Sequence, residues 1–350
     1  METKAAENEF EADSNDNDDL YEQYRFKVDK GQDPFRVDKF LINRIVNISR
    51  SRIQTAAKAG QILVNEKPVK SNYRVKPHDV IQVMVSSLPE EISIEPEDIP
   101  LEIIYEDNDL LVINKQPGLV VHPGAGNKNG TLVNGLMYYY DNLPTSGDIT
   151  RGGLVHRLDK DTTGLMVVAK TQIALTKLAK QFFDRTIKRR YMALAWGDFD
   201  EDEGTIEGNI GRHPRNRFKR AVFPDGDEGK VAITHYKVLE RFGYVTLLEC
   251  RLETGRTHQI RVHMEYLNHP LFHDVTYGGD RIVKGTVYTK YKQFVDNCFA
   301  IMPRQALHAY ILGFVHPTSG EFMEFEQAAP SDFSDLLNKW RNYFKYISRA

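Results

Sequence analysis

Residues 155–170 read Val155-His156-Arg157-Leu158-Asp159-Lys160-Asp161-Thr162-Thr163-Gly164-Leu165-Met166-Val167-Val168-Ala169-Lys170. The first half is polar and charged, as in a loop, and the second half is an apolar run typical of a buried strand. Asp159 lies between basic residues and a Thr-Thr-Gly turn, directly before that strand. Folding rarely needs a carboxylate in such a place, so the segment predicts a chemically active aspartate at a loop–strand junction.

Apolar runs on both sides of this segment predict a large, strand-rich region over about residues 101–345. Helical periodicity appears at residues 173–183, 257–267 and 333–344. Strands are predicted at residues 110–114, 164–169, 190–196, 231–239, 244–251, 306–314 and 322–325. Many strands with few helices between them indicate an α+β fold with a mixed, mainly antiparallel sheet.

Three further parts are expected before this region. Residues 1–24 form an acidic leader, with nine acidic residues and one lysine between positions 1 and 22, and should be disordered. Residues 35–85 form a small αβ unit, with ten Lys/Arg against three acids between 36 and 85. Residues 86–100 form a linker rich in Pro and Glu.

Composition excludes several classes of protein. The net charge of −3 hides a leader of −8, so the remainder is about +5 (−3 minus −8), which permits an RNA partner. Cys250 and Cys298 lie far apart and form neither a disulfide framework nor a Cys-x-x-Cys zinc site. No apolar run approaches the ~20 residues that cross a bilayer, and the N-terminus is unlike a signal peptide. We therefore expect a cytoplasmic protein with no membrane association.

The segment from His156 to Gly164 resembles the catalytic loop of the RluA-type pseudouridine synthases, His-Arg-Leu-Asp-x-x-Thr-Ser/Thr-Gly, and fills every position of it. Further similar segments follow the order of the family motifs, namely Asp109–Pro123, Lys188–Leu194, Glu253–His263 and Gln305–Ala309. One segment departs from the pattern. The family has Gly-Asp-x-x-Tyr-Gly after Asn-His-Pro, whereas this chain has His273 in place of the first glycine. The departure puts the shape of that loop in question.

The unit at 35–85 resembles an S4 RNA-binding domain in its order of helix, helix, Gly60, an Ile-Leu-Val-Asn strand and a Lys-Pro-His-Asp-Val-Ile-Gln-Val strand. The resemblance implies basic helices that contact phosphates of structured RNA without reading its sequence. The expected contacts are Arg44, Arg50, Arg52, Lys58 and Arg74. An ordinary solvated basic surface is the alternative for each of them.

Together the two resemblances imply an S4 domain followed by a synthase domain with a long bent sheet and a central catalytic cleft. The implied activity is isomerisation of specific uridines to pseudouridine in structured RNA, with a stem-loop of 23S large-subunit rRNA or its precursor as the expected substrate. Neither a cofactor nor an obligatory protein partner is expected. Alternatives are another rRNA or tRNA site, a non-catalytic ribosome assembly factor and a base-releasing glycosidase.

The resemblance also implies roles for individual residues. Asp159 would attack C1′ of the sugar or C6 of the base, or would remove the C2′ proton; the sequence leaves these routes open. Arg261 would face Asp159, and Tyr191 would lie against the target base. Arg157 would fill the space that the base leaves or bind a flanking phosphate, and His156 would contact RNA.

A metal site is not expected from the histidines. The spacing of His258 and His263 fits neither a His-Glu-x-x-His motif nor a zinc finger. A structural or RNA-contacting role is the expectation for both residues and for His156.

Overall fold

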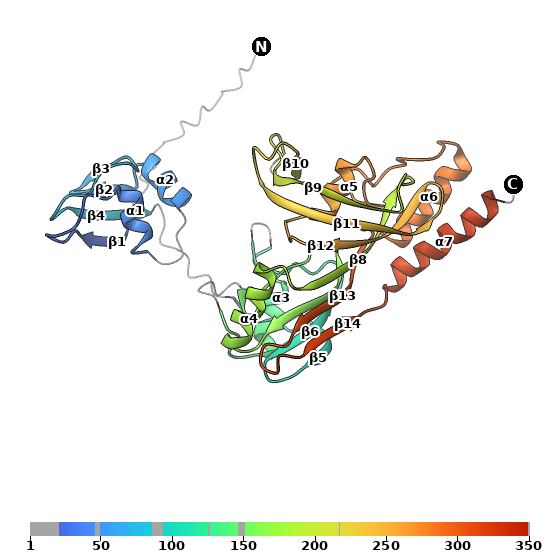
Figure 1. Cartoon of the computed structure of the whole chain (residues 1–350), viewed down its shortest axis with the longest axis horizontal. Helices are drawn as coiled ribbons and strands as arrows, with labels where there is room; N and C mark the ends of the chain where they lie inside the picture. Colours follow the sequence, from blue (N-terminus) through green and yellow to red (C-terminus); the bar gives the residue numbers. More distant parts are fainter. Residues whose placement is uncertain are drawn as a thin grey trace, which may run out of the picture. The chain divides into compact units, whose positions relative to one another are not determined.

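The computed structural model describes residues 21–45, 50–85, 94–124, 127–145, 151–216 and 218–348. The chain divides into two compact units, Met1–Ser93 and Ile94–Ala350 (Figure 1). Each unit has its own sheet and its own apolar core, so each is described by itself.

The first unit is a four-stranded antiparallel sheet packed against two short helices. Its elements are β1 (Tyr21–Lys27), α1 (Val37–Ile42), α2 (Arg50–Lys58), β2 (Ile62–Val64), β3 (Lys67–Pro68) and β4 (Val80–Val85). The strand order is β1-β4-β2-β3. Apolar side chains of both helices, among them Phe40 and Ile53, pack on Ile62 and Ile81 of the sheet. Gly60 has a φ of 73° just after α2, the left-handed conformation that glycine adopts without strain and that often ends a helix.

The N-terminal boundary of this unit differs from the expectation. Residues 21–24 were expected in a disordered leader, but they form the start of β1 and pair with β4. The acidic Glu22 fits in a strand because Arg25 donates two hydrogen bonds to it at 2.8 Å and Gln82 one at 2.6 Å. The rest of the expected leader, residues 1–20, lies outside the described residues.

The expected linker also has a different C-terminal boundary. Residues 94–100 belong to the second unit, because Ile94 is buried in its core and Asn134 donates a 2.8 Å hydrogen bond to the Glu95 carbonyl. The segment forms neither a helix nor a strand, as its composition indicated. The remaining linker residues 86–93 lie outside the described residues.

The second unit is built on a mixed ten-stranded sheet. Its strands are β5 (Glu102–Glu106), β6 (Leu110–Lys115), β7 (Thr163–Ala169), β8 (Lys188–Trp196), β9 (Glu203–Arg212), β10 (Arg220–Phe223), β11 (Lys230–Arg241), β12 (Val245–Leu252), β13 (Leu307–Val315) and β14 (Phe322–Glu326). Its helices are α3 (Leu132–Tyr139), α4 (Gln172–Phe183), α5 (Gln259–Tyr266), α6 (Thr289–Ile301) and α7 (Ser331–Ile347). In the described ranges, no helix has the length and apolar character to cross a membrane.

The sheet runs β10-β9-β11-β12-β8-β13-β7-β6-β5, and β14 pairs with β13 beside β7. All neighbours are antiparallel except β13 and β7, which are parallel and pair only at His308–Thr163 and Ala309–Gly164. The strands come very close there: a Cβ on Gly164 would lie 2.2 Å from the Ala309 carbonyl oxygen. The glycine that follows the Thr-Thr pair is therefore required where the two halves of the sheet meet.

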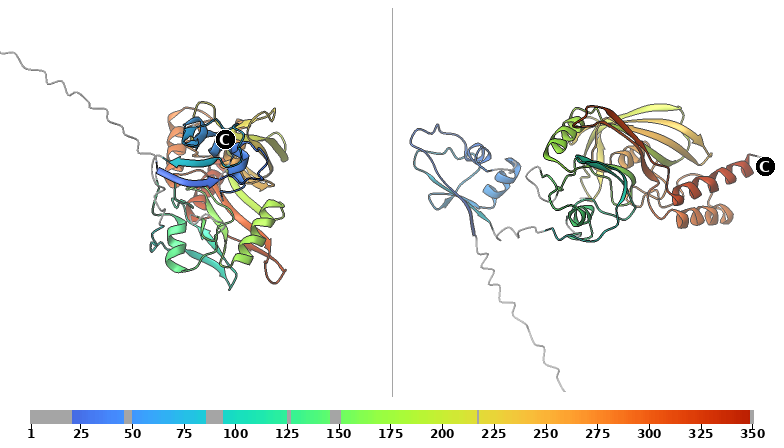
Figure 2. Two further views of the ribbon diagram at one scale, coloured as in Figure 1. Left: turned by 90° about the vertical axis from the view of Figure 1, so that its left-hand side faces the viewer. Right: turned by 90° about the horizontal axis from the view of Figure 1, so that it is seen from below.

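Alternate residues of β8 face two different cores. Tyr191, Ala193 and Ala195 pack with apolar residues of α3 and α5, whereas Leu194 and Trp196 pack with α6 and α7. The two C-terminal helices lie side by side on that second face (Figure 2). The α3–α5 face is the one that carries the pocket described next.

Candidate active site

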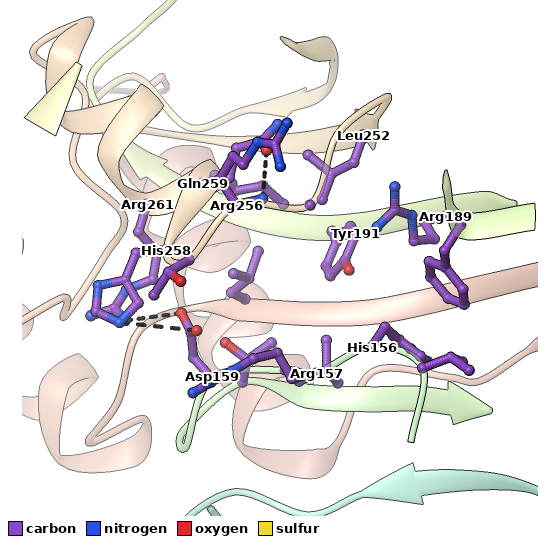
Figure 3. A pocket seen from close by; sticks show the side chains of 18 of the residues that line it. His156, Arg157, Asp159, Arg189, Tyr191, Leu252, Arg256, His258, Gln259 and Arg261 are labelled. Atoms are coloured by element: carbon purple, nitrogen blue, oxygen red, sulfur yellow. Dashed lines mark hydrogen bonds and ion pairs between the residues drawn. The ribbon is translucent and has the colours of Figure 1, made fainter. Parts of the chain in front are cut away.

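A pocket of about 420 Å³ opens on the α3–α5 face of the sheet. Its walls come from the loop before β7, from β8 and from the N-terminal end of α5 (Figure 3). The charged and aromatic side chains that line it include His156, Arg157, Asp159, Phe182, Arg189, Tyr191, His258 and Arg261. A volume of this size is typical of sites for small ligands or single nucleotides.

Asp159 points across the pocket toward α5. One carboxylate oxygen accepts a 3.0 Å hydrogen bond from Nη1 of Arg261, and only 16 % of the Asp159 side chain is exposed. Arg261 in turn forms a bidentate pair with Asp274, with Nε–Oδ2 at 2.7 Å and Nη2–Oδ1 at 2.9 Å. Asp274 is fully buried. The guanidinium is therefore held rigidly by one aspartate and presents its remaining nitrogen to the other.

The charge state of Arg261 follows from these contacts. Burial alone would lower its pKa, but the hydrogen bonds and negative charge of Asp274, with Asp159 beside them, raise the pKa above its ordinary value. The cation is thus permanent, and it places a full positive charge next to the Asp159 carboxylate.

His258 approaches the other carboxylate oxygen of Asp159. It caps α5 with a φ of 58°, and its Nε2 is 4.0 Å from Asp159 Oδ1. Its Nδ1 is 3.0 Å from the Tyr277 hydroxyl. Burial lowers the pKa of His258, although the charge of Asp159 acts in the opposite direction. A neutral imidazole next to the carboxylate leaves Arg261 as the cation that pairs with it.

Two buried side chains, Lys115 and Arg304, form hydrogen bonds with the backbone of the loop that carries Asp159. The ammonium of Lys115 donates to the carbonyls of Gln116, Leu119 and Lys160 at 2.8–2.9 Å. Nη1 of Arg304 donates to the Asp161 carbonyl at 3.0 Å. Burial lowers the pKa of Lys115 to about 7, yet three carbonyls match the three donors of the charged form. The backbone at Lys160 and Asp161, directly after Asp159, is therefore fixed.

Tyr191 forms the floor of the pocket from the middle of β8 and is 7 % exposed. The strand alternation puts it on the face opposite Met192 and Leu194, as the sequence predicted. Burial raises its pKa, and the positive charge of Arg189 acts in the opposite direction, so the phenol is neutral at ordinary pH. Its ring and the Asp159 carboxylate border the same space.

Comparison with known proteins identifies the family. Residues 109–266 match the model described as RNA pseudouridylate synthase, and residues 35–81 match the S4 domain. The chain is 46% identical over 317 residues to an "Uncharacterized RNA pseudouridine synthase" of Chlorobaculum parvum, covering 90% of this chain and 96% of that protein. The chain belongs to the RNA pseudouridylate synthase family.

Two relatives of the synthase carry a more specific name, ribosomal large subunit pseudouridine synthase D. That of Neisseria meningitidis is 47% identical, with 87% of this chain and 79% of the relative covered. That of Escherichia coli is 45% identical, with 89% and 92% covered. Among solved structures, Human RNA Pseudouridylate Synthase Domain Containing 1 aligns with a TM-score of 0.50 and 25% identity over 74% of this chain and 98% of that one. These findings confirm the expected family and fold, an S4 domain followed by a synthase domain.

The two remaining predicted residues of the pocket, Arg157 and His156, differ in their exposure and in their contacts. Arg157 is exposed at the edge of the pocket. His156 also lines the pocket, but its Nε2 accepts a 3.1 Å hydrogen bond from the Val167 backbone, and its ring stacks on Phe182 at 4.6 Å. Burial, with Arg189 nearby, lowers the pKa of His156 to about 3. A packed neutral ring leaves it less available for RNA than Arg157.

The basic residues of the S4 domain that are predicted to contact RNA also differ in their exposure and in their contacts within the fold. Lys58 and Arg74 are exposed. Arg44 is exposed too, but it lies 3.7 Å over the Phe40 ring and donates to Gln32. Arg50 forms a 3.2 Å ion pair with Asp38, which is fully buried. The negative charge of Asp38 therefore partly neutralises Arg50 within the fold. The side chain of Arg52 lies outside the described residues.

His273, the departure from the family pattern, keeps the loop shape that glycine would give. Its φ is 57°, in the left-handed region where a side chain costs free energy. The imidazole Nδ1 contacts the Met302 carbonyl at 2.6 Å and the ring packs on Phe299 at 4.4 Å. These contacts offset the strain, and the following Asp274 reaches Arg261 in the position described above.

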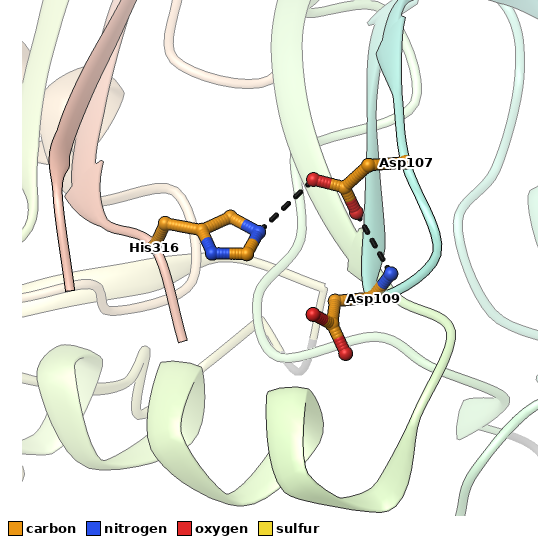
Figure 4. A group of neighbouring side chains, drawn as sticks. All are labelled: Asp107, Asp109 and His316. Carbon is orange, nitrogen blue, oxygen red and sulfur yellow. Dashed lines mark hydrogen bonds and ion pairs between the residues drawn. The ribbon is translucent and has the colours of Figure 1, made fainter. Parts of the chain in front are cut away.

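Asp107, Asp109 and His316 approach one another closely enough to hold a metal ion (Figure 4). Their hydrogen bonds indicate a different role. His316 Nε2 is 3.0 Å from Asp107, and its Nδ1 accepts from the Thr318 and Ser319 backbones. The ring is thus a donor to Asp107, and the group joins the β5–β6 turn to the end of β13.

Sequence reasoning missed Asp274, Lys115 and Arg304 as parts of the site. Asp274 was noticed only for the histidine that precedes it, and Lys115 lay in the segment Asp109–Pro123, to whose residues no role was assigned. A lysine at the end of an apolar strand and directly before a turn, as at Lys115, was a signal that could have been used.

Proposed function

We propose that Asp159 carries the isomerisation of uridine to pseudouridine and that the pocket receives a uridine turned out of its RNA stack. The observation that supports this most directly is the Asp159 carboxylate, held by Arg261 at 3.0 Å within a pocket floored by Tyr191. An extruded base gains about 1–3 kcal/mol by stacking on an aromatic ring, which offsets part of the cost of extrusion. Tyr191 is the ring that would provide it.

The reaction needs little beyond these groups. The C1′–N1 bond breaks, the uracil turns, and C5 bonds to C1′. C5 loses its proton and N1 gains one, so the nucleoside keeps its composition and no net atom or electron is taken from another molecule. Asp159 attacks as a nucleophile at C1′ or C6, or removes the C2′ proton, and each route starts from the ionised carboxylate. Arg261 acts as a positioning residue, because its 3.0 Å hydrogen bond fixes the orientation of that carboxylate.

The composition of the pocket argues against a base-releasing glycosidase. Such enzymes use two carboxyl groups across the scissile bond, one as acid and one as base or nucleophile. Among the described residues that line the pocket, Asp159 is the single carboxylate. The intact Asp159, Tyr191 and Arg261 also argue against a non-catalytic assembly factor.

We infer further that the substrate is a stem-loop of the 23S large-subunit rRNA or its precursor, and that the protein acts in the cytoplasm. The inference rests on the relatives named ribosomal large subunit pseudouridine synthase D and on the two free, buried cysteines, which suit a reducing compartment. Incubation of the purified protein with unmodified 23S rRNA, followed by mapping of pseudouridine at nucleotide resolution, should reveal one or a few sites. A transcript left unmodified, with conversion of a tRNA or small-subunit rRNA instead, would refute this target.

The S4 domain should supply much of the electrostatic affinity for RNA. Deletion of residues 1–93 is expected to weaken binding to unmodified rRNA and to flatten the dependence of log affinity on log salt, because ten Lys/Arg lie between 36 and 85. The second unit should stay folded, since its core lies within residues 94–350. Filter binding over a range of salt concentrations measures both quantities.

A matched deletion of residues 1–20 separates the acidic segment from the S4 domain. It removes negative charge without touching β1, so binding should equal or slightly exceed that of the full chain. Unchanged affinity and salt dependence in the longer deletion would show that the S4 domain is not the RNA anchor.

A further inference from the structure

Arg189 is a buried cation that faces the pocket and has no acidic partner among the described residues. It belongs to β8, two residues before Tyr191, and is 8 % exposed. Its Nε is fully buried and has no hydrogen-bond partner among the described residues. Figure 3 shows its guanidinium on the far side of Tyr191 from Asp159. Because Arg189 lines the pocket and has no acidic partner among the described residues, a ligand that enters the pocket can supply the missing counter-charge.

The two other arginines of this domain that are buried among the described residues have acidic partners. Arg261 pairs with Asp274 and Asp159, and Arg304 pairs with Asp332 at 2.8 Å. Arg190, the next residue on the opposite face, contacts Glu249 at 2.9 Å. For Arg189, burial lowers the pKa, and the nearest group with an opposing effect is Tyr191 rather than a carboxylate. Arg189 is therefore the exception among the three arginines that are buried in the described part of the chain.

Aromatic packing holds Arg189 in place. Its guanidinium lies 5.4 Å from the centre of the Phe182 ring, and the His156 ring stacks on Phe182 at 4.6 Å. His156 is neutral, as its low pKa shows, so the stack adds no repulsive charge. Gly255 faces Nη1, and a Cβ there would lie only 2.9 Å from it. The cation is thus supported through Phe182 and left open toward the pocket.

We propose that Arg189 binds a backbone phosphate of the RNA next to the uridine that enters the pocket. The proposal rests on the proposed use of this pocket for an extruded uridine. A phosphate carries the full negative charge that a desolvated guanidinium needs, and its oxygens match the planar fork of N–H donors. A carbonyl of the uracil would satisfy a donor but would leave the charge without compensation. Arg189 would fix the sugar–phosphate backbone while Asp159 reacts with the nucleoside.

The first test compares Arg189→Gln with Arg251→Gln in the full-length protein. Arg251 is an exposed arginine of β12 that does not line this pocket, so it controls for the loss of one positive charge. With unmodified 23S rRNA, Arg189→Gln should bind about 10- to 100-fold more weakly. Its salt slope should fall by roughly 0.7–0.9, the value for one phosphate contact. Arg251→Gln should retain the wild-type slope.

A second test identifies the phosphate. Neutral methylphosphonate linkages are placed one at a time around the target uridine of a synthetic stem-loop. One position should weaken binding of the wild-type protein and have no further effect on Arg189→Gln, as expected for two partners of one contact. Equal weakening of both proteins at every position would overturn the proposal.

A third variant excludes a merely structural role. Arg189→Met keeps an apolar stem against Phe182 and removes an uncompensated buried charge, so the urea midpoint of the free protein should stay the same or rise. A large fall in that midpoint, with an unchanged salt slope, would mean that Arg189 serves the fold. If wild-type protein forms pseudouridine and Arg189→Gln behaves like Arg251→Gln, only the phosphate contact is refuted. If Asp159→Asn forms as much pseudouridine as wild type, the proposed function fails whatever Arg189 shows.

Discussion

Asp159→Asn is expected to abolish pseudouridine formation, with a loss of rate of more than about 10³-fold, because removal of a nucleophile or base costs on the order of 10²–10⁶ in enzymes of known mechanism. Asparagine keeps the shape of the side chain and removes the charge that each route to pseudouridine requires. Single-turnover assays with saturating enzyme and unmodified RNA measure the chemical step directly.

The same substitution should leave the fold and RNA affinity nearly intact. Arg261 keeps its bidentate pair with Asp274, so no buried cation loses its last partner. Affinity within a few-fold of wild type and an unchanged urea midpoint would locate the defect in the chemistry. Asp159→Asn protein that converts uridine at a near-normal rate would show that another group carries the reaction.

Removal of the Arg261 guanidinium is expected to have the second-largest effect on turnover, with a smaller effect on RNA binding. Arg261→Ala, however, leaves Asp274 buried without a cation, which typically costs about 3–5 kcal/mol of stability. A loss of activity in that variant alone would not separate catalysis from folding. Arg261→Lys keeps a charge and loses the planar fork, so it should fold and turn over at a rate between those of wild type and Arg261→Ala.

A double variant separates the effect of Arg261 on catalysis from its effect on folding. Arg261→Met with Asp274→Leu removes both buried charges together, and replacement of a buried ion pair by apolar groups is often neutral for stability. We expect a folded protein with near-normal RNA affinity, a strongly reduced turnover rate and an unchanged KM for RNA. Wild-type turnover in this folded double variant would contradict the positioning role of Arg261.

Local patterns in the sequence predicted much of this protein because they depend on near neighbours. Strand alternation placed Tyr191 on the face opposite Leu194, and the loop–strand transition at Asp159 marked the site. The resemblance to the family motifs then paired Asp159 with Arg261, which the structure places 3.0 Å apart although they are 102 positions apart in the chain. Periodicity could not have found that contact, since it arises from two segments on different elements.

Some elements escaped prediction because their local signals are weak. The strand at Tyr21–Lys27 carries acidic and basic residues, and it is a strand because β4 offers a paired edge and Gln82 and Arg25 hold Glu22. The helix at Leu132–Tyr139 contains Asn134 and Gly135, which are poor helix formers. Thr131 and Asn134 form a capping box that stabilises its start.

By itself, the sequence predicted the two domains and the strand-rich class and singled out Asp159 as the candidate reactive carboxylate, because each prediction follows from composition, periodicity or a continuous motif. Only the tertiary structure decided which charges are compensated. In the structure, Arg261 pairs with Asp274 as well as with Asp159, Lys115 donates a hydrogen bond to the carbonyl of Lys160, and Arg50 pairs with Asp38. It also left Arg189 buried with no acidic partner in the part of the chain that the structure describes. The interaction free energy of a charged side chain depends on its desolvation and on the charges near it in space. Neither quantity follows from the spacing of residues along the chain.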